Sequence, residues 1–149
     1  MKLHDFLSNK SKSRPSPTRT VRFKVVGFDD RHERVVSDAV ASLAFVDEAQ
    51  RQEALQLANA ELTKAYKDDP IPPDRRTDEE SYHILQRALR DADDPRQPFA
   101  EDVRELKNGI VFKTLLHLLK DYFEFVEEEF PAAVDDEGFK GLINEAKKK

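Results

Sequence analysis

The sequence predicts an α-dominated α+β fold, in which an N-terminal β-hairpin is followed by three helices and a short C-terminal helix. Two stretches near the N-terminus have the apolar pattern of strands, whereas later segments repeat apolar residues every three or four positions. Prolines separate these later segments, and proline cannot continue a helix. With 149 residues, of which 38% are hydrophobic, the chain can build one modest core.

Residues 20–46 predict the hairpin. From Thr20, the stretch TVRFKVVGF alternates apolar and basic side chains, which is the period of a half-buried strand. We expect a turn at Asp29–Asp30 and a second strand within the apolar stretch 35–46. The pattern leaves one alternative open, a helix that starts near Ser37 and runs into the next element.

Two helices are expected between the hairpin and residue 90. The first runs from Asp47 to about Tyr66, and Asp47 and Gln50 have the spacing of a capping box. Three prolines in the stretch 70–73 end it. The second is expected to open with a capping box at Thr77 and Glu80 and to run to Leu89, before a proline-containing loop.

A third helix is expected from about Ala100 to Phe130, with a weak point at Asn108–Gly109 and an end at Pro131. From Ile110 onward its apolar residues cover about half of the circumference, which is more than the ~100° stripe that docks a surface helix. Neighbouring helices, a second copy or a partner protein could each cover this arc. Aromatic residues are enriched at interfaces, so the candidate partner-binding residues are those of the arc and of a short C-terminal stripe: Tyr122, Phe123, Phe125, Val126, Phe130, Leu142 and Ile143.

The two ends differ from the body at 20–131, which we expect to be one domain. Residues 1–19 hold five basic residues and one acidic residue, and Ser8–Thr20 contains no large apolar side chain. We therefore expect a disordered basic arm, which either solubilises the protein or touches an acidic surface. Residues 132–149 predict a linker, a short amphipathic helix over 139–146 and a basic end. That helix would dock on the domain or fold on a partner.

The composition argues against catalysis. The chain has no Cys, which excludes disulfides, thiolate metal sites and Cys nucleophiles. The four His residues are scattered and are expected to be solvated, as are the paired carboxylates. We find no nucleotide-binding or nucleophile motif, and we expect no catalytic, cofactor-binding or metal-binding residue.

The same composition bears on location and partners. No apolar run approaches the ~20 residues that span a bilayer, and the N-terminus does not resemble a secretory signal. We therefore expect a cytoplasmic protein with no membrane partner. The net charge is −5 although the arm is basic, so the body is strongly acidic and would repel nucleic acid.

The order of three segments, YHILQRALRD, DPRQPFAEDVRELK and LLKDYFEFVEEEFP, resembles that of the tail assembly chaperones of long-tailed bacteriophages over roughly residues 20–131. The resemblance implies a mostly helical, non-enzymatic protein of the host cytoplasm, which binds the tape-measure protein and keeps it soluble during tail assembly. In this family a longer, frameshifted product recruits the tail tube protein, so tube protein is a further partner that the resemblance implies. The basic arm 1–19 departs from the family pattern.

An alternative use of the apolar helix is self-association. A head–tail adaptor, a small oligomeric scaffold or another virion or regulatory interaction protein would need the same wide arc to pack copies of itself. The sequence therefore leaves a homo-oligomer open beside the chaperone.

Overall fold

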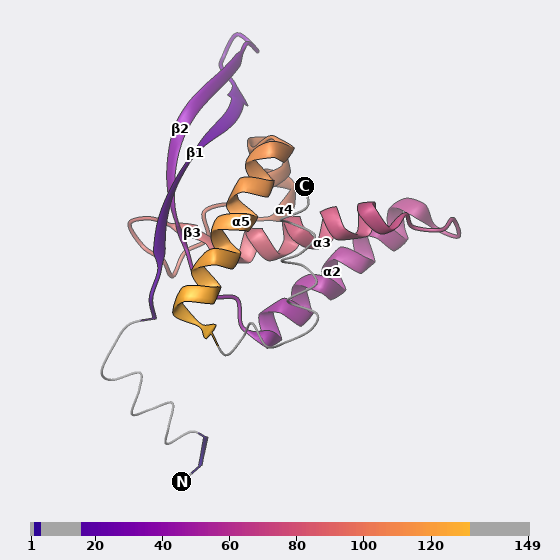
Figure 1. The fold of residues 1–149 in the computed structure, drawn as a ribbon. Helices are drawn as coiled ribbons and strands as arrows, with labels where there is room; N and C mark the ends of the chain where they lie inside the picture. The colour runs from indigo at the N-terminus through magenta and orange to yellow at the C-terminus, as the bar shows by residue number, and fades with distance from the viewer. Residues whose placement is uncertain (1, 4–15, 132–149) are drawn as a thin grey trace.

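The chain folds into a small antiparallel sheet with helices packed against one of its faces (Figure 1). The computed structural model describes residues 2–3 and 16–131. Its elements are β1 (Arg19–Phe28), β2 (Arg34–Leu43), α2 (Glu48–Tyr66), α3 (Pro73–Ala88), β3 (Leu89–Asp91), α4 (Val103–Gly109) and α5 (Phe112–Glu129). The predicted α+β fold with an N-terminal hairpin is confirmed, whereas the expected C-terminal helix at 139–146 lies outside the described residues.

The hairpin pairs β1 with β2 along their whole length, from Arg19 opposite Leu43 to Phe28 opposite Arg34. This pairing excludes the alternative of a helix starting at Ser37. At the turn, the Asp29 carboxylate accepts hydrogen bonds from the backbone N–H groups of residues 31 and 33 at 2.9 Å each. The second strand ends at Leu43, and one position beyond the Leu43–Leu89 pair the N–H of Ala44 donates to the carbonyl of Ala88 at 2.9 Å.

The third strand was not expected. Residues Leu89–Asp91 pair with β2, and Leu89 lies opposite Leu43 with both side chains buried. We predicted that α3 would include Leu89 and lead into a loop. The free edge of β2 offers backbone partners to this segment, and pairing there satisfies groups that burial would otherwise leave unbonded. Local propensity carries no sign of this contact between distant residues.

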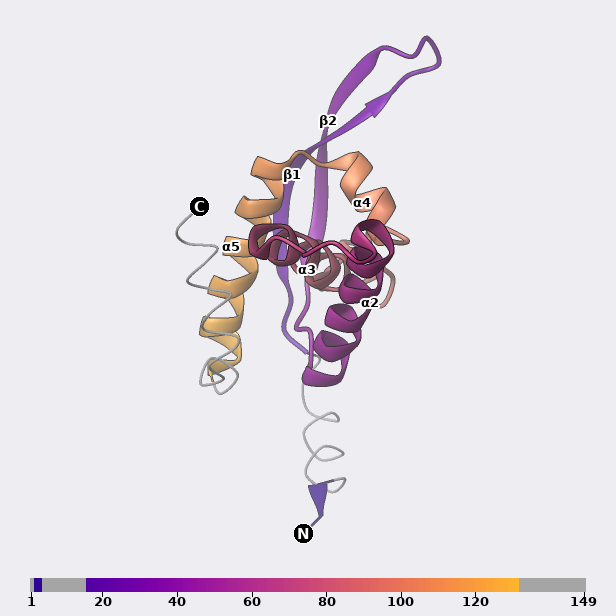
Figure 2. The same cartoon turned by 90° about the vertical axis from the view of Figure 1, so that its right-hand side faces the viewer.

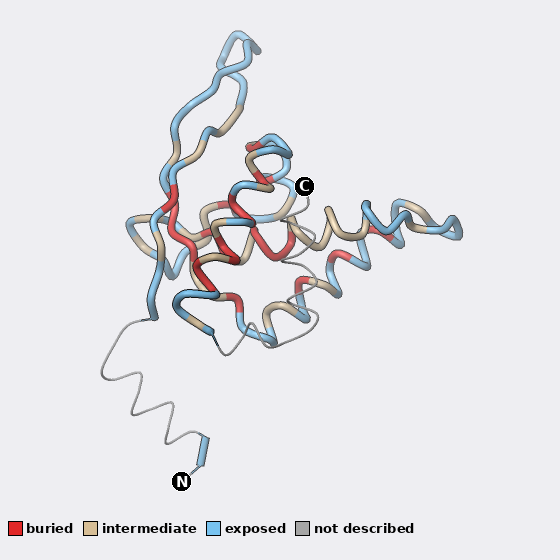
Figure 3. Tube along the Cα trace, in the orientation of Figure 1, coloured by how far each residue is buried: buried red, intermediate tan, exposed pale blue. Residues whose placement is uncertain are grey.

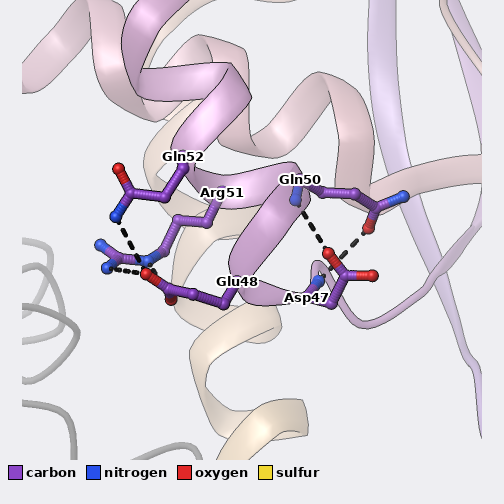
Figure 4. A network of polar contacts seen from close by, with 5 residues as sticks. All are labelled: Asp47, Glu48, Gln50, Arg51 and Gln52. Atoms are coloured by element: carbon purple, nitrogen blue, oxygen red, sulfur yellow. Dashed lines mark hydrogen bonds and ion pairs between the residues drawn. The ribbon is translucent and has the colours of Figure 1, made fainter.

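The first predicted helix is confirmed in its start, cap and end. In α2 the Asp47 carboxylate accepts from the N–H of Gln50 at 2.8 Å, and the Gln50 side chain accepts from the N–H of Asp47 at 3.3 Å (Figure 4). Glu48 binds the side chains of Arg51 and Gln52 on the same turn. These contacts hold the pKa of Glu48 at about 2, with the hydrogen bond from Arg51 as the main cause.

The second helix begins five residues earlier than predicted, at Pro73 with Pro72 as its cap. Proline suits the first turn of a helix, where its missing N–H would have no partner in the helix. Thr77 therefore lies inside α3, and its hydroxyl donates to the carbonyl of Pro73 at 3.0 Å instead of capping a helix.

The third predicted helix is divided in two at its weak point. α4 ends at Gly109, and residues 110 and 111 are extended before α5 begins. Ile110 lies in this break and is buried in the core. A continuous helix would point its side chain in another direction. The expected start at Ala100 is also wrong, because α4 begins at Val103 after Asp102, whose carboxylate accepts from the N–H of Glu105 at 2.8 Å.

The core lies between the sheet and the helices, with α3 in contact with α2, α4 and α5. Beyond this core the outer half of the hairpin extends away from the helices, as two views at right angles show (Figures 1 and 2). Colouring by burial places buried residues at the base of the hairpin and exposed residues toward its tip (Figure 3). Within the described residues, no helix has the length and apolar content needed to cross a membrane.

Candidate protein-binding surface

The apolar arc of α5 is buried within the domain. Tyr122, Phe123, Phe125 and Val126 are all buried, and Phe130 is half-buried at the end of the helix. The structure thus places four of the predicted partner-binding side chains in the core and not on an open surface. Phe130 is a fifth, at the edge of the core, and the last two, Leu142 and Ile143, lie outside the described residues.

The side chains that cover this arc come from the start of β1 and from the segment that follows β2. The ring of Phe45 stacks on that of Phe130 at 4.4 Å between centroids, and Phe130 meets Phe125 edge to face at 5.7 Å. The Arg19 guanidinium lies 5.6 Å from the centroid of Phe125 and forms an ion pair with Glu128. The start of β1 and the segment after β2 therefore supply the second direction of cover that so wide an arc requires.

Tyr122 has a polar role inside this cluster. Its hydroxyl oxygen accepts a hydrogen bond from the backbone N–H of Val46 at 3.1 Å. Burial raises the pKa of Tyr122 to about 12, opposed by that hydrogen bond. The phenol therefore stays neutral over the whole physiological range and acts as a structural acceptor.

A cleft of about 660 Å³ lies between α2, α3 and α4. Its lining is charged with both signs, and it includes His83, which is buried. The expectation that this histidine is solvated is therefore wrong. Glu79, one helical turn before it, lies 3.2 Å from its Nε2, and Lys107 of α4 contacts the same carboxylate at 2.6 Å. The Glu79–His83 spacing in the sequence was a signal for this pair.

Burial and neighbouring charges shift the pKa values of two side chains at or beside the cleft. Burial lowers the pKa of His83, although the hydrogen bond with Glu79 opposes the shift. Burial also raises the pKa of Tyr82, whose ring lies 5.3 Å from the Lys107 ammonium. Among the described residues, no group of three or more His, Asp or Glu side chains is placed to hold a metal ion. Three side chains of this lining, Glu79, His83 and Lys107, are linked to one another.

The hairpin carries the exposed apolar surface. Paired residues of antiparallel strands share a face, and the face with Val21, Phe23, Ala41 and Leu43 is turned to the core. We call the opposite face of the sheet the open face. Four successive pairs from its base to the hairpin tip are Arg22 with Val40, Lys24 with Asp38, Val26 with Val36, and Phe28 with Arg34.

Large apolar side chains of the open face remain in contact with solvent. The exposed fractions are 76% for Phe28, 55% for Val36 and 40% for Val40. The alternation from Thr20 predicted that this face would be polar, so the sequence analysis did not identify it as an apolar surface. A signal was present, because Val26 and Phe28 are out of phase with the apolar residues that enter the core.

Comparison with protein-family models, with curated proteins and with solved structures found no match to this chain.

Proposed function

We propose that this protein is a non-enzymatic binding protein that acts as a phage tail assembly chaperone, keeping the tape-measure protein soluble by covering its apolar segments. The observation that supports this proposal is the exposed apolar surface of the hairpin. Phe28, Val36 and Val40 occupy one face and stay exposed in the part of the chain that the structure describes.

The hairpin geometry favours a binding role over a purely structural one. A two-stranded ribbon is at best marginally stable in water without cover on one face. β3 pairs with residues 41–43 of β2, which lie at the base of the hairpin. The helices stop short of the tip (Figure 2). A partner that buries the valines and Phe28 would gain apolar contact and would stabilise the ribbon at the same time.

This contact surface replaces the one that the arc of α5 suggested. The buried residues of that arc could reach a client only if the domain opened, which would separate the Phe45–Phe130 and Val46–Tyr122 contacts. The hairpin needs no such opening. We therefore place the client on the hairpin and assign the α5 arc to the core.

The test is co-expression with a client. The client is a long, heptad-rich tape-measure protein, and the readout is the fraction of that client in the soluble lysate. We expect the wild-type protein to keep the client soluble in a stoichiometric complex. The variant Phe28→Ser with Val36→Ser should lose this effect while its far-ultraviolet spectrum and melting temperature stay close to those of the wild type.

The matched control is Leu57→Ser, which changes an apolar side chain of α2 that is 47% exposed. It should protect the client as well as the wild type does. If the wild-type protein leaves the client insoluble, the chaperone proposal is wrong. If the hairpin variant changes only the protein's own oligomeric state in sedimentation, a self-associating virion protein replaces the chaperone.

A further inference from the structure

We infer that the open face of the sheet selects acidic, amphipathic segments of its protein partner. This inference rests on the proposed function and adds to it the charge of the segment that binds. It is carried by three arginines of the open face whose side chains have no ionic partner within the described part of the chain.

The first step is the position of these arginines. Arg22 and Arg34 belong to rows of the open face that also hold Val40 and Phe28. Arg90 of β3 lies opposite Ser42 in β2, and Ser42 lies opposite Thr20 in β1, so Arg90 lies on the same face, near its base. Basic groups are thus placed at both ends of the exposed valines.

The second step is that no acidic side chain of the described residues pairs with these three arginines. In residues 16–131, the side chains of Arg22, Arg34 and Arg90 make no hydrogen bond or ion pair. The one acid of these rows, Asp38, lies 2.5 Å from Lys24 and is neutralised by it. The open face therefore carries an excess of positive charge, although the chain as a whole has a net charge of −5.

The side chain of Arg90 also has a hydrogen-bond donor without an acceptor. Its Nε is buried and has no hydrogen-bond partner among the described residues. A buried donor without a partner is unfavourable, and more so when the group is charged. A carboxylate is the group that matches a guanidinium in both charge and geometry. Arg90 as a whole is half-buried, so a partner acid at the base of the open face would compensate a guanidinium charge that no acid of the described residues pairs.

The chemistry of the face selects among the possible occupants. A second copy would bring arginines against arginines, which is unfavourable. Nucleic acid would meet the exposed side chains of Val36 and Val40 between the arginines, and these offer no group that binds phosphate. A protein segment with an apolar stripe flanked by Asp or Glu satisfies both the exposed valines and the unpaired arginines.

The experiment uses the full chain and two synthetic peptides of about 20 residues, each an amphipathic helix with leucines on one face. One peptide has Glu flanking the leucines and the other has Lys at the same positions. Binding is followed by fluorescence anisotropy at about 0.15 M salt, where charges more than ~8 Å apart are screened. We expect the Glu peptide to bind the wild-type protein and the Lys peptide to bind it at least about tenfold more weakly.

The variant R22E/R34E should weaken binding of the Glu peptide by about tenfold or more, because two favourable charges become two repulsive ones. It should also gain affinity for the Lys peptide. The control R75E/R104E makes the same change in net charge at two exposed arginines on α3 and α4. It should stay within about twofold of the wild type, since those residues are on helices and not on the open face of the sheet.

Four outcomes would overturn the inference: no binding of the Glu peptide at about 1 mM, equal binding of both peptides, equal effects of the two double variants, or displacement of the Glu peptide by a short RNA. Client solubility separates this failure from that of the proposed function. If R22E/R34E keeps the tape-measure client as soluble as the wild type does, charge selection is wrong but the chaperone stands. If the wild type does not protect the client, the chaperone itself is wrong.

Discussion

The backbone N–H of Val46 donates a hydrogen bond to the hydroxyl oxygen of Tyr122 at 3.1 Å, and both residues are buried. This bond joins the segment that follows β2 to the middle of α5, across 76 positions of sequence. It gives a polar partner to a backbone group that leaves the sheet inside the core, where an unpaired N–H would be costly. The Tyr122 hydroxyl thus satisfies the backbone of the buried segment that connects β2 to α2.

Replacing Tyr122 with phenylalanine should therefore destabilise the protein without changing its shape. The ring would still fill the core, but the Val46 N–H would lose its acceptor. We expect the free energy of unfolding, measured with urea, to fall by about 1–3 kcal/mol. The control Tyr66→Phe, at the half-exposed end of α2, should change it by less than about 0.5 kcal/mol. Equal values for the two variants would contradict this role.

The same tyrosine predicts a loss of stability at high pH. Its pKa is about 12 in the folded protein, whereas its ordinary value is 10.0. Between these values the unfolded chain releases the proton and the folded protein keeps it, so the free energy of unfolding falls as pH rises. The loss attributable to Tyr122 reaches about 2 kcal/mol by pH 12. In unfolding curves at pH 9 to 11, the difference between wild type and Tyr122→Phe should shrink as the pH increases.

His83 predicts the opposite trend on the acid side. Burial lowers its pKa below 6.5, and Glu79 and Glu61 oppose that shift whereas Lys107 adds to it. The contribution to stability is fully present above pH 6.5. It decreases as the pH falls toward the lower folded pKa, because the unfolded chain takes up the proton first. His83→Gln should therefore show a smaller drop in melting temperature between pH 7 and pH 5 than the wild type. An unchanged drop would show that His83 does not titrate in this way.

The aromatic arc can be tested as core. Phe125 is fully buried between Phe130 and Arg19, so Phe125→Ala should lower the free energy of unfolding by about 3–5 kcal/mol. Leu57→Ala, at a largely exposed position of α2, should cost less than about 1 kcal/mol. Both values follow from urea unfolding at neutral pH. A small cost at Phe125 would mean that the arc is not packed as the structure shows, and a partner surface on α5 would return as the better explanation.

The two capping boxes that the sequence suggested should behave differently. Asp47 caps α2 with its side chain, whereas Thr77 lies inside α3 and binds the carbonyl of Pro73. Asp47→Ala should therefore destabilise the protein by about 1 kcal/mol. Thr77→Ala should leave it within about 0.5 kcal/mol of the wild type, because alanine is the better helix former at an interior position. A loss at Thr77 as large as that at Asp47 would favour the later helix start.

The sequence by itself determined the elements whose signals are local. Alternation from Thr20, the Asp47–Gln50 spacing and the prolines after residue 69 predict β1, the start of α2 and its end, and all three are confirmed. Each depends on residues only a few positions apart, so the physical cause lies within the segment that shows it. Asn108–Gly109 likewise marked the place where the last helical segment is interrupted.

Only the tertiary structure decided what covers each apolar face. The stack of Phe45 on Phe130 makes the α5 arc core, β3 forms because β2 has a free edge, and Lys107 from another helix encloses the Glu79–His83 pair. The hairpin is the converse case, since Phe28 and Val36 are apolar strand residues but remain largely exposed among the residues that the structure describes. A side chain's hydrophobicity is a property of the residue, whereas its burial depends on neighbours brought from distant parts of the chain.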